Sequence, residues 1–334
     1  MQKQEITIYD VAREAKVSMA TVSRVVNGNN NVRKETRDRV LEVINRLHYQ
    51  PNAVAQGLAS KKSTTVGLIV PDFTNLHFAE LSQGINDIAT LYKYNILLSS
   101  IGNNLLDDDR VIQGLLNKQV DGVIYMADQI SAKGKETLMR SNIPVVLAGT
   151  LSENKDSFGS VAIDYAKAIT ESLNTFIKDS KKNFALVLDD PNTYLSSEYF
   201  KDSFNNFVDA NSINNAHIYT AIRTYEEGYK LVEQLQKDKI DAVLTIKDTP
   251  AAGIINGLLD NKVKIPEEVE LISMGSTNIG KIVRPHLTSV QQPLYDIGAL
   301  AMRMLTKLMN NEEIEEKNIV LPYNMVPGKT TLAK

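Results

Sequence analysis

The sequence contains no cysteine and no tryptophan among its 334 residues, and these absences narrow its chemistry. Without cysteine the chain has no disulfide, no thiolate metal ligand and no cysteine nucleophile, and it suits a reducing compartment. No stretch approaches the ~20 apolar residues of a membrane helix, and the N-terminus lacks the apolar core of a signal peptide. We therefore expect a cytoplasmic protein with no membrane partner.

Signatures of catalysis are also missing from the sequence. The four histidines are isolated from one another: His48, His77, His217 and His286. No glycine-rich phosphate loop follows a predicted strand, and neither a nucleophile motif nor a metal-ligand cluster is visible. The sequence thus predicts a protein that is not an enzyme and requires no metal or cofactor.

Charge is distributed unevenly, although the whole chain has a net charge of only −3. Residues 1–62 hold 11 Lys and Arg against 6 Asp and Glu, a net +5, whereas the remainder holds 26 against 34, a net −8. A basic end on an acidic body is expected where only that end meets nucleic-acid phosphates.

The basic end contains the spacing of two short amphipathic helices joined by a tight turn. Its apolar positions are Val11, Ala12, Ala15, Val17, Val22 and Val25. Ser18 is a plausible N-cap of the second helix. A third helix, about 34–47, supplies further core residues: Val40, Leu41, Val43, Ile44 and Leu47. Such helix pairs also occur without DNA, but the basic charge favours a DNA-binding helix-turn-helix.

The remaining residues, about 270, are enough for two lobes of ordinary domain size. Short apolar runs alternate with amphipathic helices, and the predicted strands are 66–70, 96–100, 122–126, 144–147 and, after Val161, 184–188, 217–221, 242–246 and 271–274. Near-continuous apolar strands separated by helices are typical of buried parallel sheets. The fold class is therefore α/β, with doubly wound parallel sheets behind a three-helix head.

Several motifs resemble those of the lactose-repressor family of bacterial transcription regulators. They are Thr7-Ile-Tyr-Asp-Val-Ala12, Val17-Ser-Met-Ala-Thr-Val-Ser-Arg-Val-Val-Asn-Gly28 and Tyr49-Gln-Pro-Asn-Ala-Val-Ala55. Later segments resemble the catabolite-control branch of that family in low-GC Gram-positive bacteria: Ala59-Ser-Lys-Lys-Ser63, Tyr92-Lys-Tyr-Asn95, Lys118-Gln-Val-Asp-Gly122, Val283-Arg-Pro285 and Arg303-Met-Leu-Thr-Lys307. The resemblance implies a transcription regulator, mainly a repressor, of carbon catabolite control.

The resemblance also implies how the chain is divided. The helix-turn-helix head would span 1–50, a hinge helix and linker 51–63, and a two-lobed body like a periplasmic binding protein 64–334. The first lobe would take about 64–161 and 293–321, and the second about 162–292 and 322–334. The chain would cross between the lobes near Ala162, Gln292 and Pro322.

By the same resemblance, the protein would be nucleoid-associated and would bind a pseudo-palindromic operator in double-stranded DNA as a homodimer. Base contacts are expected from Met19, Ala20, Thr21, Arg24, Leu58 and Ala59, with Leu58 wedged into the minor groove. Backbone contacts are expected from Tyr9, Ser18, Asn27, Tyr49 and Asn52. Arg24 could instead be a solvated surface arginine, and Tyr49 a core residue of the head.

Two classes of effector are compatible with the sequence of the body. Ser273-Met-Gly-Ser276 stands where the family often has an aspartate at Gly275, and residues 194–209 contain no arginine, so tight binding of a free sugar is not expected. The resemblance offers serine-phosphorylated phosphocarrier protein HPr, docked on Asp296, Leu300, Arg303, Lys307, Tyr92 and Lys93. These charges could also form only a solvated surface. The alternative effector is a sugar phosphate such as fructose 1,6-bisphosphate or glucose 6-phosphate in the inter-lobe cleft, with Asp248 as a possible contact.

Overall fold

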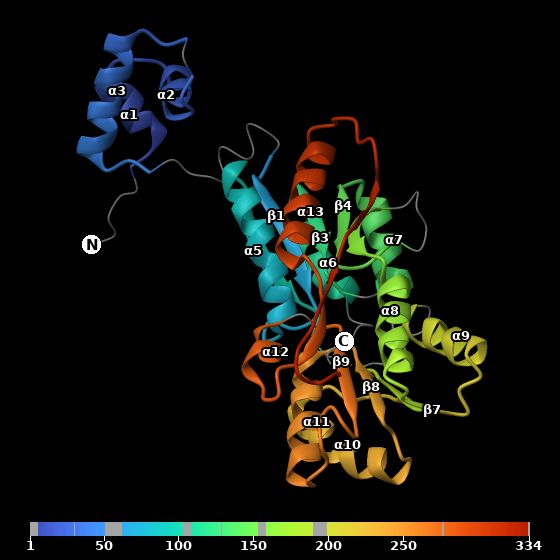
Figure 1. The fold of residues 1–334 in the computed structure, drawn as a ribbon. Coiled ribbons are helices and arrows are strands. Elements are labelled where there is room, and N and C mark those ends of the chain that lie inside the picture. The colour runs from blue at the N-terminus through green and yellow to red at the C-terminus, as the bar shows by residue number, and fades with distance from the viewer. Residues whose placement is uncertain are drawn as a thin grey trace. The chain divides into compact units, whose positions relative to one another are not determined.

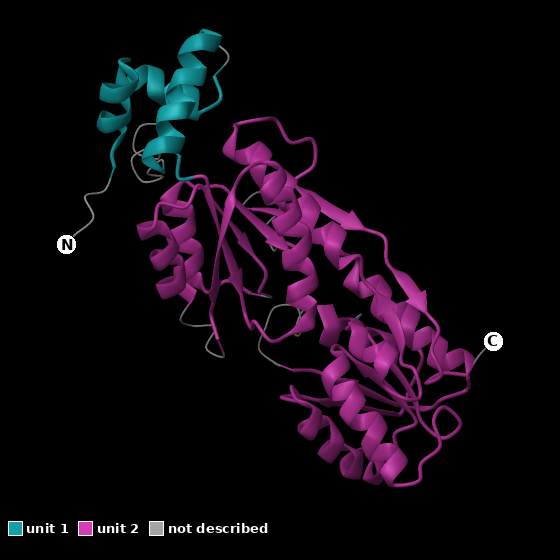
Figure 2. Ribbon diagram, turned by 90° about the vertical axis from the view of Figure 1, so that its left-hand side faces the viewer, with its two compact units in different colours: residues 1–63 teal, residues 64–334 magenta. Residues whose placement is uncertain are grey.

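The computed structural model describes residues 6–29, 31–50, 62–102, 108–127, 129–152, 158–189, 199–275 and 277–332. The chain forms two compact units, Met1–Ser63 and Thr64–Lys334 (Figure 2). The hinge residues Asn52, Leu58 and Ala59 lie outside the described ranges.

Three helices make up the N-terminal unit: α1 (Ile8–Ala15), α2 (Met19–Val26) and α3 (Lys34–Leu47). The left-handed backbone of Lys16 ends α1, and Ser18 caps α2. The predicted apolar positions form one core, in which Val11, Val22 and Val40 are fully buried. The prediction for Leu41 is wrong: its side chain is 42% exposed, because it lies one position beyond the inward stripe of α3.

The body contains two six-stranded sheets, which confirms the predicted α/β class. The first sheet has the strand order β11-β5-β4-β3-β1-β2, and the second has the order β12-β10-β9-β8-β6-β7. All pairings are parallel, as predicted, except the antiparallel pairing between β10 and β12. The first-sheet strands are β1 (Thr65–Val70), β2 (Asn95–Ser100), β3 (Gly122–Tyr125), β4 (Val145–Ala148), β5 (Gly159–Ile163) and β11 (Asn318–Leu321). The second-sheet strands are β6 (Asn183–Val187), β7 (Asn215–Tyr219), β8 (Ala242–Thr245), β9 (Glu270–Ser273), β10 (Thr288–Gln291) and β12 (Asn324–Val326).

Helices cover both faces of each sheet (Figure 1). On the first sheet, α5 (Leu76–Leu91) and α13 (Leu294–Met309) pack on one face, and α6 (Asp108–Asn117) and α7 (Ala132–Ser141) pack on the other. The second sheet is covered by α8 (Tyr165–Lys178) and α9 (Asp202–Ala210) on one face, and by α10 (Tyr225–Lys237) and α11 (Asp248–Asp260) on the other. Alternating side chains of each strand therefore enter two different cores.

The chain passes between the two sheets after β5, after β10 and after β11. At the second of these crossings Gln292 is buried; its Nε2 donates to the carbonyl oxygen of Met274 (2.7 Å), and its Oε1 accepts from the hydroxyl of Tyr165 (3.2 Å). The same hydroxyl lies 2.6 Å from the carbonyl oxygen of Gly149 in the first lobe. The crossing is thus hydrogen-bonded to both lobes. Within the described ranges, no helix is long and apolar enough to cross a membrane.

Candidate DNA-binding and effector-binding sites

The second helix of the head separates its core residues from its exposed ones. The hydroxyl of Ser18 accepts from the backbone N–H of Thr21 (3.2 Å) and so caps α2, whose first residue is Met19. Val22 and Val25 face inward, whereas Met19, Ala20 and Arg24 are exposed. None of the ion pairs among the described residues includes Arg24. An exposed, uncompensated arginine at this position can approach base edges in a major groove.

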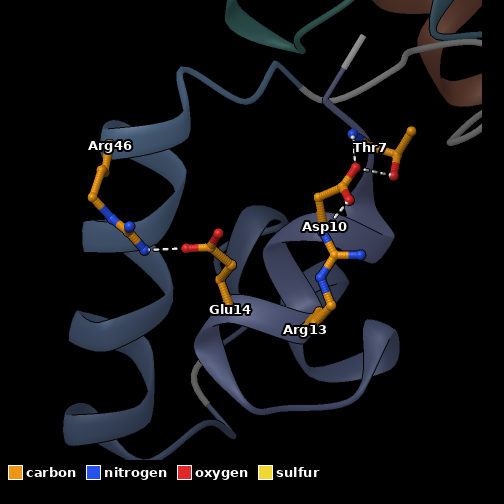
Figure 3. A network of polar contacts seen from close by, with 5 residues as sticks. All are labelled: Thr7, Asp10, Arg13, Glu14 and Arg46. Atoms are coloured by element: carbon orange, nitrogen blue, oxygen red, sulfur yellow. Dashed lines mark hydrogen bonds and ion pairs between the residues drawn. The ribbon is translucent and has the colours of Figure 1, made fainter. Parts of the chain in front are cut away.

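A polar network holds α1 in place (Figure 3). The carboxylate of Asp10 accepts from the backbone N–H (3.0 Å) and the hydroxyl (2.7 Å) of Thr7, and it pairs with Arg13 at 2.7 Å. The Thr7 hydrogen bonds, followed by Arg13, lower the pKa of Asp10. Glu14 pairs with Arg46 and thereby joins α1 to α3. These arginines therefore have partners inside the head, in contrast to Arg24.

The candidate DNA-backbone contacts differ in exposure. Tyr9 is 65% exposed, and Ser18 and Asn27 are also exposed. Tyr49 is partly buried and packs against the head core, and burial raises the pKa of its hydroxyl. Both readings of Tyr49 are compatible with this position, since its ring packs inward while part of its surface remains accessible.

In the first lobe, two glycines allow α5 and α13 to pack closely. A Cβ at Gly84 would lie 2.1 Å from the carbonyl oxygen of Tyr295, and a Cβ at Gly298 would lie 2.1 Å from that of Leu81. No side chain fits at either position without moving a helix. The hydroxyl of Tyr295 also donates to Asp87 across this contact (3.0 Å). The two helices thus present one continuous surface.

The C-terminal ends of α5 and α13 both lie where the strands of the first sheet begin (Figure 1). After α5, the N–H of Asn95 bonds to the carbonyl oxygen of Thr64 (2.8 Å), and Leu305 and Met309 of α13 lie against Gly122, the first residue of β3. Ile297, Ala301 and Leu305 are buried, while the residues predicted to contact a phosphoprotein face outward. Asp296, Arg303, Lys307, Tyr92 and Lys93 are exposed, and Leu300 is partly buried.

In the second lobe, Asp248 is only 2% exposed and its carboxylate is bonded within its own lobe. Oδ1 accepts from the hydroxyl of Ser273 (2.5 Å), and Oδ2 accepts from the N–H (2.6 Å) and the hydroxyl (2.7 Å) of Thr277. A Cβ at Gly275 would lie 2.5 Å from Oδ1. The glycine where the family often has aspartate is therefore explained: the Asp248 carboxylate occupies the adjacent space.

Between the lobes lies a group of polar side chains that the sequence did not reveal. Lys247 follows β8 and pairs with Asp189, whose backbone carbonyl oxygen accepts from Nε of Arg223 (3.1 Å). The imidazole of His77 in the first lobe is hydrogen-bonded to the backbone of Gly275 in the second lobe. Burial and the neighbouring Lys247 lower the pKa of His77 to about 4, so its imidazole is neutral at pH 7.

The positions of Lys247 just after β8 and of Asp189 just after β6 were the available signal for this group, because polar residues at strand ends line the crevice of doubly wound folds. Within the described parts of the chain, no group of three or more histidine and carboxylate side chains is placed to hold a metal ion.

Comparison with known proteins connects this geometry to a family. Residues 7–52 match the model described as bacterial regulatory proteins, lacI family, and residues 173–331 match the periplasmic binding protein-like domain. The chain is 58% identical over 334 residues, and the whole length of both proteins, to the HTH-type transcriptional regulator pepR1 of Lactobacillus delbrueckii subsp. lactis. It is 45% identical over 329 residues to catabolite control protein A of Staphylococcus epidermidis, covering 98% of this chain and 99% of that protein.

Solved structures agree with these matches. The transcription regulator CcpA of Lactococcus lactis superimposes with a TM-score of 0.74 at 34% identity, over 80% of this chain and 99% of that one. The lac repressor dimer bound to operator superimposes with a TM-score of 0.87 at 22% identity, over 99% and 100% of the two chains, which shows a shared fold. The chain therefore belongs to the lacI family of bacterial regulatory proteins, and it is a DNA-binding transcription regulator rather than an enzyme.

Proposed function

We propose that this protein is a homodimeric regulator of carbon catabolite control, mainly a repressor, whose operator affinity rises when serine-phosphorylated HPr docks on α5 and α13. The observation that carries the proposal is the pair Arg303 and Lys307, exposed one turn apart on a helix whose other face is buried. Among the described residues, neither cation belongs to an ion pair. Two such cations are suited to a phosphoserine.

The rest of the proposed docking surface surrounds this pair. Leu300 and the exposed Tyr92 offer apolar area, Lys93 adds a third cation, and Asp296 adds an anion that can pair with a basic residue of the partner. Close packing through Gly84 and Gly298 fixes the two helices relative to each other. Because α13 directly follows the buried crossing at Gln292, a partner bound there can favour one arrangement of the lobes.

At the operator, the proposed base contacts are Met19, Ala20, Thr21 and Arg24 in the major groove, with Leu58 and Ala59 of the hinge in the minor groove. Met19 and Ala20 can give only apolar contact, so polar readout depends chiefly on Arg24. The proposed backbone contacts are Tyr9, Ser18, Asn27, Tyr49 and Asn52. In a homodimer two heads would read the two halves of a pseudo-palindrome.

Arg303→Ala tests the partner assignment. Charge-assisted hydrogen bonds to phosphate contribute about 1.5–3 kcal/mol, so the variant should bind phosphorylated HPr about tenfold more weakly or worse and lose its enhancement of DNA binding. Basal operator affinity should stay unchanged. Arg140→Ala is the matched control, since Arg140 is an exposed arginine on α7, across the same sheet. Undiminished enhancement in Arg303→Ala would overturn the assignment.

A second candidate effector is a sugar phosphate in the inter-lobe cleft. The observation that favours it is Lys247, a cation placed between the lobes beside His77 of the other lobe. Calorimetry with glucose 6-phosphate and fructose 1,6-bisphosphate, on the wild type and on Lys247→Ala, tests this role. Micromolar binding that the variant loses, together with no response to phosphorylated HPr, would favour the small molecule as the effector.

A further inference from the structure

The second lobe contains a cavity of about 250 Å³ that none of the sites above uses. Its walls come from α12 (Asn278–Ile282), from β10 and the residues before it, and from the chain that follows β12. Polar side chains around it include Thr277, Lys281, His286, Ser289, Gln291 and Lys329. The inter-lobe residues Lys247, Asp189 and His77 do not line it.

The walls of this cavity are basic although the body as a whole is acidic. Residues 277–294 and 318–332 contain Lys281, Arg284 and Lys329 but no aspartate or glutamate. In the described part of the chain, none of these cations belongs to an ion pair. The carboxylate behind α12 belongs to Asp248, and it already accepts hydrogen bonds from Ser273 and Thr277. The cavity thus has uncompensated positive charge.

Arg284 lies between the lining residues Lys281 and His286 in the sequence, and its side chain contacts both segments. Its Nη1 donates to the carbonyl oxygens of Lys281 (3.0 Å), Ile282 (2.8 Å) and Val283 (3.0 Å), and it lies 3.1 Å from Nδ1 of His286. These contacts hold the His286 ring beside the 281–284 segment, and His286 itself lines the cavity.

Gly328 allows the two basic segments, residues 277–294 and 318–332, to approach each other. A Cβ at Gly328 would lie 2.3 Å from the carbonyl oxygen of His286, so only glycine allows this approach of the chain after β12 to the residues before β10. The next N–H, that of Lys329, then donates to the same oxygen at 2.6 Å. Lys329 and His286, far apart in the sequence, are thereby fixed at the edge of one cavity.

From this arrangement we infer a second small-molecule site that binds an organic phosphate monoester. The lysines supply point charges for a phosphate dianion, the His286 ring supplies a donor, and Leu287, Val326 and Pro327 supply an apolar wall for the organic part. The volume lies just below the ~300 Å³ at which drug-sized pockets begin, so it suits one small ligand. Such a ligand would contact β10 and the end of β12, the strands at which two crossings meet the second lobe.

Isothermal titration calorimetry on the full-length protein tests this site with inorganic phosphate and phenyl phosphate as probes. Phenyl phosphate should bind with one site per chain and at least about tenfold more tightly than inorganic phosphate, because its ring is buried against the apolar wall. Lys281→Ala and Lys329→Ala should each weaken binding about fivefold, and the double variant Lys281→Glu/Lys329→Glu should abolish it. Lys264→Ala, an exposed lysine elsewhere in the second lobe, should leave binding unchanged.

Lys281, Lys329 and Lys264 are exposed, and circular dichroism of each variant checks that it is folded. To separate this site from the inter-lobe cleft, the same titration is run on Lys247→Ala, which should bind phenyl phosphate as the wild type does. Absence of saturable binding at millimolar phenyl phosphate would overturn the proposal. Equal binding by the double charge-reversal variant, or loss of binding in Lys247→Ala alone, would overturn it as well.

Discussion

Replacing Glu270 by glutamine should change how the stability of the second lobe depends on pH. Glu270 lies on β9 with no exposed surface; its Oε1 accepts from the N–H of Leu332 (2.9 Å), and Oε2 has no conventional donor among the described residues. Burial raises the pKa of this carboxyl from 4.5 to about 7; the Leu332 hydrogen bond opposes the shift, and the neighbouring Asp179 carboxyl adds to it. The neighbouring Asp179 carboxyl thus adds to the effect of burial in disfavouring the ionised form of Glu270.

The charged neighbours of Glu270 are Lys181 and Asp179. Lys181 lowers the pKa of Glu270, but its ammonium also donates to the backbone carbonyl oxygens of Pro266 (3.0 Å), Glu267 (3.0 Å) and Glu268 (3.3 Å). Because these carbonyl oxygens hold its ammonium, Lys181 is not free to neutralise an ionised Glu270. Above pH 7 the folded lobe has to hold an extra negative charge in its interior.

The sign of the effect follows from proton binding. Between pH 4.5 and 7 the folded protein holds a proton on Glu270 that the unfolded chain has released, so the free energy of unfolding falls as pH rises. The full shift of the Glu270 pKa corresponds to about 3 kcal/mol. Glutamine cannot ionise, so Glu270→Gln should match the wild type at about pH 4, below the unfolded pKa, and be more stable by up to about 3 kcal/mol at pH 8.

Urea unfolding followed by far-ultraviolet circular dichroism at several pH values measures this difference, and hydrogen exchange at β9 localises it. Glu267→Gln, an exposed neighbour, is the control and should follow the wild-type curve. Parallel stability curves for the wild type and Glu270→Gln from pH 5 to 8 would refute the reasoning, since the buried carboxyl would then keep its unfolded-state pKa.

Three further substitutions test other parts of the structure. Arg24→Ala should weaken specific operator binding by about 1–3 kcal/mol while leaving binding to random DNA nearly unchanged, as measured by anisotropy at fixed salt. Gly298→Ala should lower the free energy of unfolding by about 1–3 kcal/mol in urea titrations, because its Cβ would meet the Leu81 carbonyl oxygen; an unaltered midpoint would contradict the close packing. Glu14→Gln should cost less than about 1 kcal/mol in thermal melts, since the Glu14 and Arg46 side chains are 37% and 59% exposed.

Much of the architecture could be predicted from the sequence because local periodicity carried it. The third helix begins and ends at the predicted residues, and Ser18 caps α2 because a hydroxyl directly before an apolar stripe is a local signal. The strands β10, β11 and β12 had no such signal: they are only three or four residues long and include exposed positions such as Val320. Their pairing depends on partners far away in the sequence.

The candidate functional sites also contain residues that local spacing predicts and residues that only the packing of the sheets brings together. The outward direction of Arg24 and Arg303 follows from helical spacing, and both side chains are exposed. The contact between His77 and Gly275, and the approach of Gly328 to His286, join segments separated by many residues and depend on how the sheets pack. Asp248 looked like a cleft residue in sequence, but only the fold shows that Ser273 and Thr277 occupy its carboxylate.

We propose that a phosphoprotein docked on the first lobe controls the affinity for DNA. The most direct measurement is a fluorescence-anisotropy titration of the full-length protein on an operator selected with it in vitro, at one stated salt concentration. Serine-phosphorylated HPr should lower the dissociation constant about tenfold, within the usual range of allosteric coupling, while unphosphorylated HPr should leave it unchanged. Equal dissociation constants with phosphorylated and unphosphorylated HPr would contradict the account.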